Sequence, residues 1–151
     1  MDLGFADWVL VVGCLCLSAI AGAGLFQALF VMPEYFADPP ASLRRFQADR
    51  SFVFWLPLHG LALVSLVLAL IVQWDTPRRA AIVVAAGCYV LTWAITLAFF
   101  IPGVIRFNKV DADGPPSAEL AEAGRRWIRR SWGRHVLTVA TALSLLIALA
   151  T

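Results

Sequence analysis

The sequence predicts an all-α membrane protein: a transmembrane four-helix bundle of up-down topology with both termini outside. Of its 151 residues, 61% are hydrophobic and only 15% are charged, and the mean hydropathy is +0.81. Soluble domains average about 45–50% apolar and about 25% charged residues. A soluble enzyme, a disordered chain and a disulfide-rich secreted module are therefore excluded. The length fits one domain over residues 1–151, and a net charge of +2 does not indicate nucleic-acid binding.

Four apolar stretches predict the four spans, at about residues 8–32, 52–74, 80–102 and 132–151. The first three contain no Asp, Glu, Lys or Arg, and each has the roughly 20 residues that cross a hydrocarbon core. The fourth becomes long enough when it includes His135 and Arg134, whose side chains can reach the interface. Because no water reaches backbone amides in the bilayer core, each span is expected to be helical.

Prolines and turn-forming residues mark the expected ends of these helices. Pro33 and the pair Pro39–Pro40 are expected to end the first helix, and Asp75-Thr76-Pro77 to form the turn after the second. Ser117 is the predicted N-cap of the segment that leads into the fourth span. Asp2 and Asp7, with no basic residue before the apolar run, favour a retained first span over a cleaved signal peptide.

The distribution of basic residues predicts the orientation. Ten of the 12 Lys and Arg residues fall in the first and third loops, and the other two fall in the second loop. The positive-inside rule then places loops one and three in the cytoplasm and both termini outside. The expected location is a bacterial cytoplasmic membrane.

Polar residues inside the spans are expected to meet near the cytoplasmic side. Polar groups in the bilayer are costly and usually face a bundle interior, so they are the first candidates for function. Spacings of three and four residues place them on one face of each helix. The predicted face of helix three is Tyr89, Thr92, Thr96, Phe99 and Arg106, and that of helix four is Trp127, Ser131, Arg134, Thr138 and Thr141. The predicted pocket is lined by Gln27, His59, Asn108, Ser131 and Arg134.

Structural interpretations of the same residues remain open. Gln27 can serve only as a hydrogen-bonding contact between helices, and the Arg125–Arg130 cluster only as a topological anchor. His135 is expected to have a structural role at the interface, whereas the deeper His59 needs a partner and is favoured as functional. Cys14, Cys16 and Cys88 lack the C-x-x-C spacing of a thiol oxidoreductase and are expected to be buried free thiols. No metal-ligand cluster is present, and a haem held between the two histidines stays open as an alternative.

Three stretches resemble a family of small four-helix membrane proteins that includes the anthrone oxygenases. The first helix ends in G-A-G-L-F-Q-A-L-F-V-M-P (Gly22–Pro33), and the third in F-F-I-P-G-V-I-R-F-N (Phe99–Asn108). R-R-W-I-R-R-S-W-G-R-H-V-L (Arg125–Leu137) is similar to a W-x3-N-x2-R pattern that opens the last helix, with serine at position 131 in place of asparagine. The resemblance extends over essentially the whole chain.

This resemblance implies oxidation of a carbanion-forming aromatic or polyketide-like molecule by dioxygen, with no metal or organic cofactor. The implied catalytic residues are His59 as base, with Arg134 and Asn108 stabilising an enolate. The implied substrate contacts are Gln27, Trp55, Thr96, Phe99, Trp127, Ser131 and Thr138. The expected partners are the lipid bilayer and a small lipophilic or aromatic molecule, with a homo-oligomer or a larger membrane complex also open.

Two other classes of function compete with this one. A non-enzymatic membrane subunit or a carrier of a lipophilic ligand would suit the Gly- and Ala-rich first helix, because small residues permit close helix association. A subunit that binds haem or quinone is the third alternative.

Overall fold

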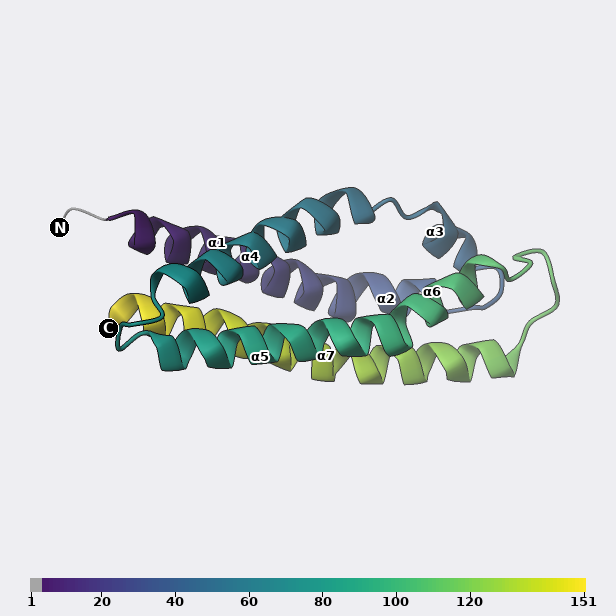
Figure 1. The fold of residues 1–151 in the computed structure, drawn as a ribbon. Coiled ribbons are helices and arrows are strands. Elements are labelled where there is room, and N and C mark those ends of the chain that lie inside the picture. The colour runs from purple at the N-terminus through teal and green to yellow at the C-terminus, as the bar shows by residue number, and fades with distance from the viewer. Residues whose placement is uncertain (1–3) are drawn as a thin grey trace. The chain divides into compact units, whose positions relative to one another are not determined.

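The computed structural model describes residues 4–151, so Asp2 of the predicted N-terminal segment lies outside the described residues. All regular elements of the described chain are helices (Figure 1). In chain order they are α1 (Phe5–Phe26), η1 (Gln27–Val31), α2 (Met32–Tyr35), α3 (Leu43–Ala48), α4 (Phe52–Val72), α5 (Arg79–Ile95), η2 (Thr96–Phe100), α6 (Ile101–Asn108) and α7 (Ala118–Ala150). The predicted all-α class is confirmed for this part of the chain.

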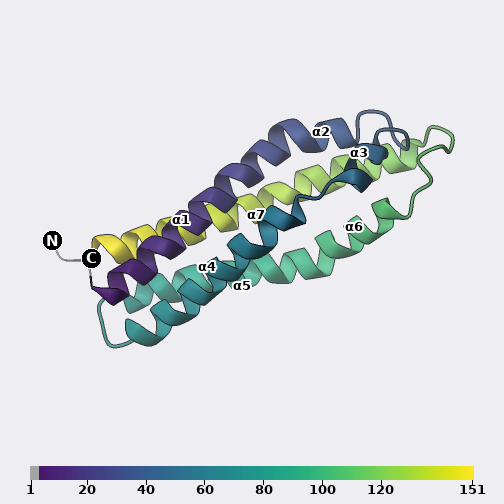
Figure 2. The same ribbon diagram turned by 90° about the horizontal axis from the view of Figure 1, so that it is seen from above.

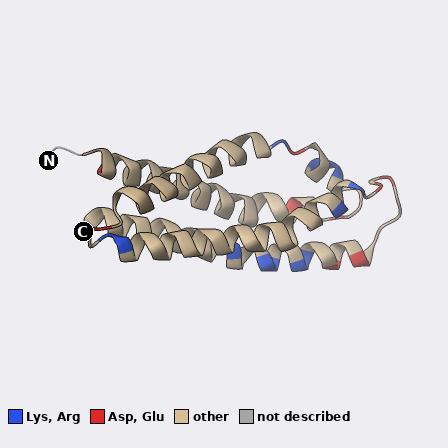
Figure 3. Cartoon of the chain, viewed as in Figure 1, with Lys and Arg blue, Asp and Glu red and all other residues tan. Residues whose placement is uncertain are grey.

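Within residues 4–151, four continuous helical stretches are long and apolar enough to cross a membrane, which agrees with the prediction of four spans. They are Phe5–Tyr35, Phe52–Val72, Arg79–Asn108 and Ala118–Ala150. The last is a single helix of 33 residues, so the charged segment and the fourth span are continuous. Its charged residues all lie in its first half, as Figure 3 shows. Ser117 accepts a hydrogen bond from the backbone N–H of Leu120 at 3.3 Å, as expected of an N-cap.

Pro33 does not end the first helix, contrary to the prediction. The backbone N–H of Met32 bonds to the carbonyl of Gln27, and the N–H of Ile101 bonds to the carbonyl of Thr96. These are the i to i−5 bonds of a π-helical turn. The donors Met32 and Ile101 directly precede Pro33 and Pro102. Proline lacks an N–H, and its ring clashes with the carbonyl four residues earlier in an α-helix. The wider π turn relieves that clash, so both helices continue past their prolines.

The described residues form two compact units, each built from parts of the long helices. The first unit contains residues 4–22, 51–92 and 136–151, and the second contains residues 23–50 and 93–135. The first unit therefore holds α4 and most of α5, whereas the second holds η1, α2, α3, η2 and α6.

Small side chains let the helices of the first unit approach closely. Gly13 of α1 is buried, and a Cβ atom at this position would lie 3.0 Å from Leu145 Cδ1 and 3.2 Å from Ser65 Cβ. Ala62 of α4 and Ala85 of α5 are completely buried. Membrane helices associate mainly through such close packing, because the lipid chains are as apolar as the side chains they replace.

Aromatic side chains fill the core of the second unit, whose helices α2, α3 and α6 are labelled in Figure 2. Trp127 of α7 packs edge-on against Phe36, Phe46 and Phe107, with ring centroids 5.7–5.8 Å apart. The ring of Phe100, in η2, also packs against this indole, with its centroid 5.5 Å away. Because Phe46 belongs to α3, the short helix of the first loop is part of this core.

Gly124 of α7 gives a test of how closely this core is packed. A Cβ atom at Gly124 would overlap the ring of buried Phe36. The variant Gly124→Ala is therefore expected to lower the free energy of unfolding by about 1–3 kcal/mol, the typical cost of overpacking a core. Thermal unfolding in detergent micelles, followed by circular dichroism, would measure the loss.

Gly133 of the same helix is the matched control. It is exposed, and a Cβ atom there would meet nothing within 4 Å. Because Ala is a better helix former than Gly by roughly 1 kcal/mol, Gly133→Ala is expected to unfold at the same temperature or a higher one. Equal destabilisation by both variants would contradict the packing of Gly124 against Phe36.

Candidate functional site

The predicted site residues are divided between the two units. The first unit holds three of them, and the second holds the other seven. The residues of the first unit are Trp55, His59 and Thr138; those of the second are Gln27, Thr96, Phe99, Asn108, Trp127, Ser131 and Arg134.

His59 of α4 has a tyrosine partner within the first unit. The hydroxyl of buried Tyr89 donates to the backbone carbonyl of His59 at 2.8 Å, and its oxygen lies 3.2 Å from His59 Nδ1. With the hydroxyl hydrogen directed to the carbonyl, we assign the ring hydrogen to Nδ1, which donates to Tyr89 Oη. Nε2 then carries the lone pair. A histidine that is oriented by a neighbour through one ring nitrogen has the form of a general base at the other.

The other two predicted residues of the first unit have different surroundings. Trp55 is half-buried one turn before His59, and the two ring centroids are 6.3 Å apart. Thr138 of α7 is buried. Trp55 is therefore placed to shield one side of the imidazole of His59.

Arg134 is the least exposed Lys or Arg residue of the second unit. Its guanidinium carbon lies 4.4 Å from the centroid of the Phe100 ring, within the range of a cation–π contact. Arg134 is half-buried and Phe100 is only 2% exposed. The pair therefore places a permanent positive charge against a buried aromatic surface.

Phe100, and not the predicted Phe99, holds this place. In a regular α-helix of 3.6 residues per turn, Arg106 points roughly 100° away from Tyr89, whereas Phe107 returns to nearly the same direction. In the structure the buried residues are Phe100 and Phe107, and Arg106 is exposed. The spacing of the predicted face is shorter than 3.6 residues per turn, so its last member does not share the direction of its first. The predicted inward position of Arg106 is therefore wrong.

Two predicted substrate contacts take part in packing. Trp127 is 6% exposed within its ring of phenylalanines. Ser131 is fully buried, and its hydroxyl donates to the backbone carbonyl of Ile128 at 2.6 Å. Phe99 is half-buried, and together with Trp127 it lines a recess beside α6.

The remaining predicted residues of the second unit lie at helix junctions. Gln27 and Thr96 are the half-buried first residues of η1 and η2, and their carbonyls accept the π-helical bonds. Asn108 is the exposed last residue of α6. The end of α6 is held from the first loop, because Gln47 Nε2 donates to the carbonyls of Phe107 and Val110 at 3.1 and 2.9 Å.

His135 is buried, although the sequence places it at the membrane interface. It is 4% exposed, and its Nε2 atom has no hydrogen-bond partner among the described residues. Its ring lies close enough to α1 that a Cβ atom at Gly24 would be 2.9 Å from Nδ1. The glycine is therefore required for the ring to fit, and His135 is an interior residue of the second unit.

In residues 4–151 the potential metal ligands are not grouped, and the cysteines are not bonded to one another. Residues 4–151 contain no cluster of three or more His, Cys, Asp or Glu side chains that could hold a metal ion. Cys14 and Cys16 are buried and Cys88 is half-buried, and all three are free thiols.

No protein-family model, curated protein or solved structure matches this chain. The resemblance to the anthrone oxygenases therefore stays a prediction from the sequence motifs.

The His59–Tyr89 pair can be tested by replacing Tyr89 with phenylalanine. The variant removes the acceptor of the Nδ1 hydrogen, so the imidazole of His59 is expected to change from the Nδ1–H tautomer toward a mixture of both. The ¹⁵N chemical shifts of the His59 ring would report this change. The ring signals of His135, in the other unit, serve as the internal control. Unchanged His59 signals would contradict the assigned hydrogen bond.

Proposed function

We propose that this chain is an integral membrane protein that binds a flat, lipophilic aromatic molecule and oxidises it with dioxygen, as its resemblance to the anthrone oxygenases implies. The observation that carries the proposal is the position of Arg134. Its guanidinium packs on the buried ring of Phe100, in a helix apolar enough to span a membrane. Charged side chains within spans are costly and are by default functional candidates.

The proposed reaction converts a CH₂ group between two aromatic rings into a ketone. The carbon loses two hydrogens, one atom of dioxygen becomes the carbonyl oxygen, and the other leaves as water. Electrons and atoms balance without an added reductant, because the deprotonated substrate itself reduces dioxygen. The protein must then supply a base for the CH₂ proton, a positive charge for the enolate oxygen, and apolar surroundings for the rings.

Arg134 is suited to supply the positive charge for the enolate oxygen. A guanidinium group stays charged under all physiological conditions and presents several N–H donors in one plane. Where water is scarce, such a charge stabilises a developing oxyanion far more than it does in bulk water. Phe100 fixes the plane of the guanidinium, and Asn108, Gln27 and Thr96 are the proposed polar contacts of the same unit.

Each unit offers one histidine for the role of base. The pairing of His59 with Tyr89 leaves Nε2 as its basic nitrogen. His135 is buried with Nε2 unpartnered among residues 4–151. A buried polar atom without a partner is costly, so a ligand or water is expected to contact this nitrogen in the working protein. Both histidines are therefore candidates for the base, although the sequence favours only His59 for this role.

The proposed topology follows the distribution of charge. We propose an up-down arrangement with loops one and three in the cytoplasm and both termini outside, in a bacterial cytoplasmic membrane. This arrangement agrees with the location of ten of the 12 Lys and Arg residues in those two loops.

Substitution of Arg134 tests the proposed enzyme directly. In membranes that contain Arg134→Gln, conversion of anthrone to anthraquinone is expected to fall about 100-fold or more, as it does when an oxyanion donor is lost. Arg134→Lys keeps the charge and is expected to retain part of the activity. Arg129→Gln, an exposed position on the same helix, is the matched control and should turn over at the wild-type rate. Equal activity in all four proteins would remove Arg134 from the mechanism.

Separate substitution of the two histidines identifies the base. A histidine base must be unprotonated to accept the CH₂ proton, so the rate is expected to rise with pH as the base loses its own proton. The variant that lacks the base, His59→Gln or His135→Gln, is expected to lose both activity and this pH dependence. The other variant should keep the wild-type profile, measured as kcat/KM from dioxygen uptake. If both profiles match the wild type, neither histidine is the base.

A non-enzymatic membrane subunit or ligand carrier is the second candidate, and the packing of two predicted contacts favours it. Trp127 is enclosed by phenylalanine rings, and Ser131 is bonded to its own helix. Binding of anthrone without dioxygen uptake would support the carrier, and co-purification of a larger partner would support the subunit. An absorption spectrum with a Soret band would instead indicate haem.

A further inference from the structure

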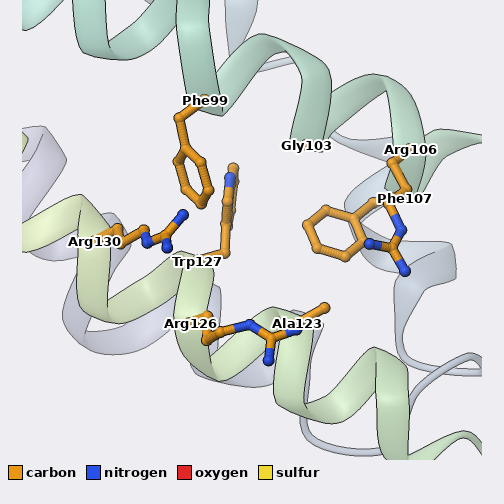
Figure 4. A pocket seen from close by; sticks show the side chains of 8 residues that line it. All are labelled: Phe99, Gly103, Arg106, Phe107, Ala123, Arg126, Trp127 and Arg130. Carbon is orange, nitrogen blue, oxygen red and sulfur yellow. The ribbon is translucent and has the colours of Figure 1, made fainter.

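A recess in the second unit has a composition that the proposed oxidation does not explain. It lies between α6 and α7, has a volume of about 240 Å³ and is partly open (Figure 4). Its polar lining consists of three arginines and one tryptophan: Arg106 from α6, with Arg126, Trp127 and Arg130 from α7. The rings of Phe99 and Phe107, with Gly103 and Ala123, form the rest of its wall.

The charge of this recess is incompletely balanced by the protein. Arg106 bonds to Glu119 at 2.8 Å. Glu122 lies 3.8 Å from Arg126, but it already accepts two closer hydrogen bonds from Arg125. Arg130 has no carboxylate partner among the described residues.

Arg130 is held in place by an aromatic ring. Its guanidinium carbon lies 4.5 Å from the centroid of Phe99, a contact that orients the group without neutralising it. Figure 4 shows this guanidinium beside the ring of Phe99 and close to the indole of Trp127. The recess therefore contains a positive charge that is oriented and available to an anion.

The indole N–H of Trp127 is a second and independent sign of a missing ligand. Trp127 is 6% exposed, and its Nε1 atom has no hydrogen-bond acceptor among residues 4–151. Buried N–H groups are nearly always paired with an acceptor. Trp127 lines the recess with its nitrogen turned toward α6 (Figure 4). An oxygen atom in the recess would satisfy this donor.

Gly103 lets α6 lie close to this N–H. A Cβ atom at Gly103 would lie 2.9 Å from Trp127 Nε1, so a larger residue would crowd the donor. The glycine, the indole N–H and the guanidinium of Arg130 together form one side of a site for an anion with several oxygen atoms.

The surroundings of the recess indicate which class of anion it would bind. The described residues form four helices that can span a membrane, and the half-buried ring of Phe99 lines the recess. A solute phosphate would use the cations alone, whereas a phospholipid would also place hydrocarbon beside such an apolar side chain. Basic pockets between membrane helices are known sites for acidic lipid headgroups.

We propose that the recess between α6 and α7 binds the phosphate group of an anionic phospholipid, with Arg130 as its main cation and the Trp127 N–H as a direct donor. This proposal does not depend on the proposed oxidation, although Phe99 and Trp127, two of the implied substrate contacts, also line the recess. The lipid phosphate would join α6 to the charged half of α7, so it also fixes the second unit at its basic end.

Titration of the delipidated, detergent-solubilised protein with short-chain phosphatidylglycerol tests the proposal. The expected affinity is about tenfold or more higher than for phosphatidylcholine. The Trp127 indole N–H signal, assigned by comparison with Trp127→Phe, is expected to shift downfield as the lipid binds, while the other indole signals stay in place. Arg130→Gln should weaken binding about fivefold, the effect of one cation near an acidic headgroup. Gly103→Ala should abolish the indole shift.

Arg129→Gln is the matched control, because it removes an equal charge from the next residue of α7 and does not line the recess. Equal weakening by Arg129→Gln and Arg130→Gln would show attraction to the general surface charge and would overturn the site. Inorganic phosphate is the second ligand, and an indole shift at equal affinity would overturn the assignment to a lipid. Unchanged binding in Gly103→Ala would overturn the role of the Trp127 N–H. Circular dichroism melting of Arg130→Gln confirms that any loss comes from a folded protein.

Discussion

The pairing of every backbone N–H and C=O group within its own helix is the constraint on which the rest of this structure depends. In hydrocarbon an unpaired peptide group finds no water, so a span must remain helical from one side to the other. Pro33 and Pro102 interrupt that pairing in two of the long helices. Both helices respond with a π turn, which keeps the chain helical and adds one residue to the turn. Both helices thereby continue past their prolines.

The side chains that follow η2 divide between the core and the recess. Phe100 and Phe107 enter the core, and Arg106 is exposed. Phe100 meets both Trp127 and the guanidinium of Arg134. Arg106 lines the recess that we assign to a lipid phosphate. The helix that continues past Pro102 therefore contributes to both the aromatic core and the charged recess of the second unit.

Tryptophan and arginine have complementary roles in that unit. Trp127 buries a large apolar surface against phenylalanine rings, while its N–H remains unpaired within the described chain. Arg130 and Arg134 each lie over a phenylalanine ring, which stabilises a guanidinium where solvent is limited. Packing and ligand recognition are therefore not alternatives for these residues, because the same aromatic rings provide the core and orient the charges.

The sequence by itself determined the helical class, the four apolar spans and the residues that bear chemistry, because composition and hydrophobic length are set by the bilayer. It also placed Ser117 at a helix start, since capping is a local interaction. Only the tertiary structure decided that Tyr89 orients His59, that Phe100 holds Arg134, and that Gly24 makes room for His135. Such pairs join residues far apart in the chain. Helical spacing also assumes a constant 3.6 residues per turn, and the two π turns do not keep it.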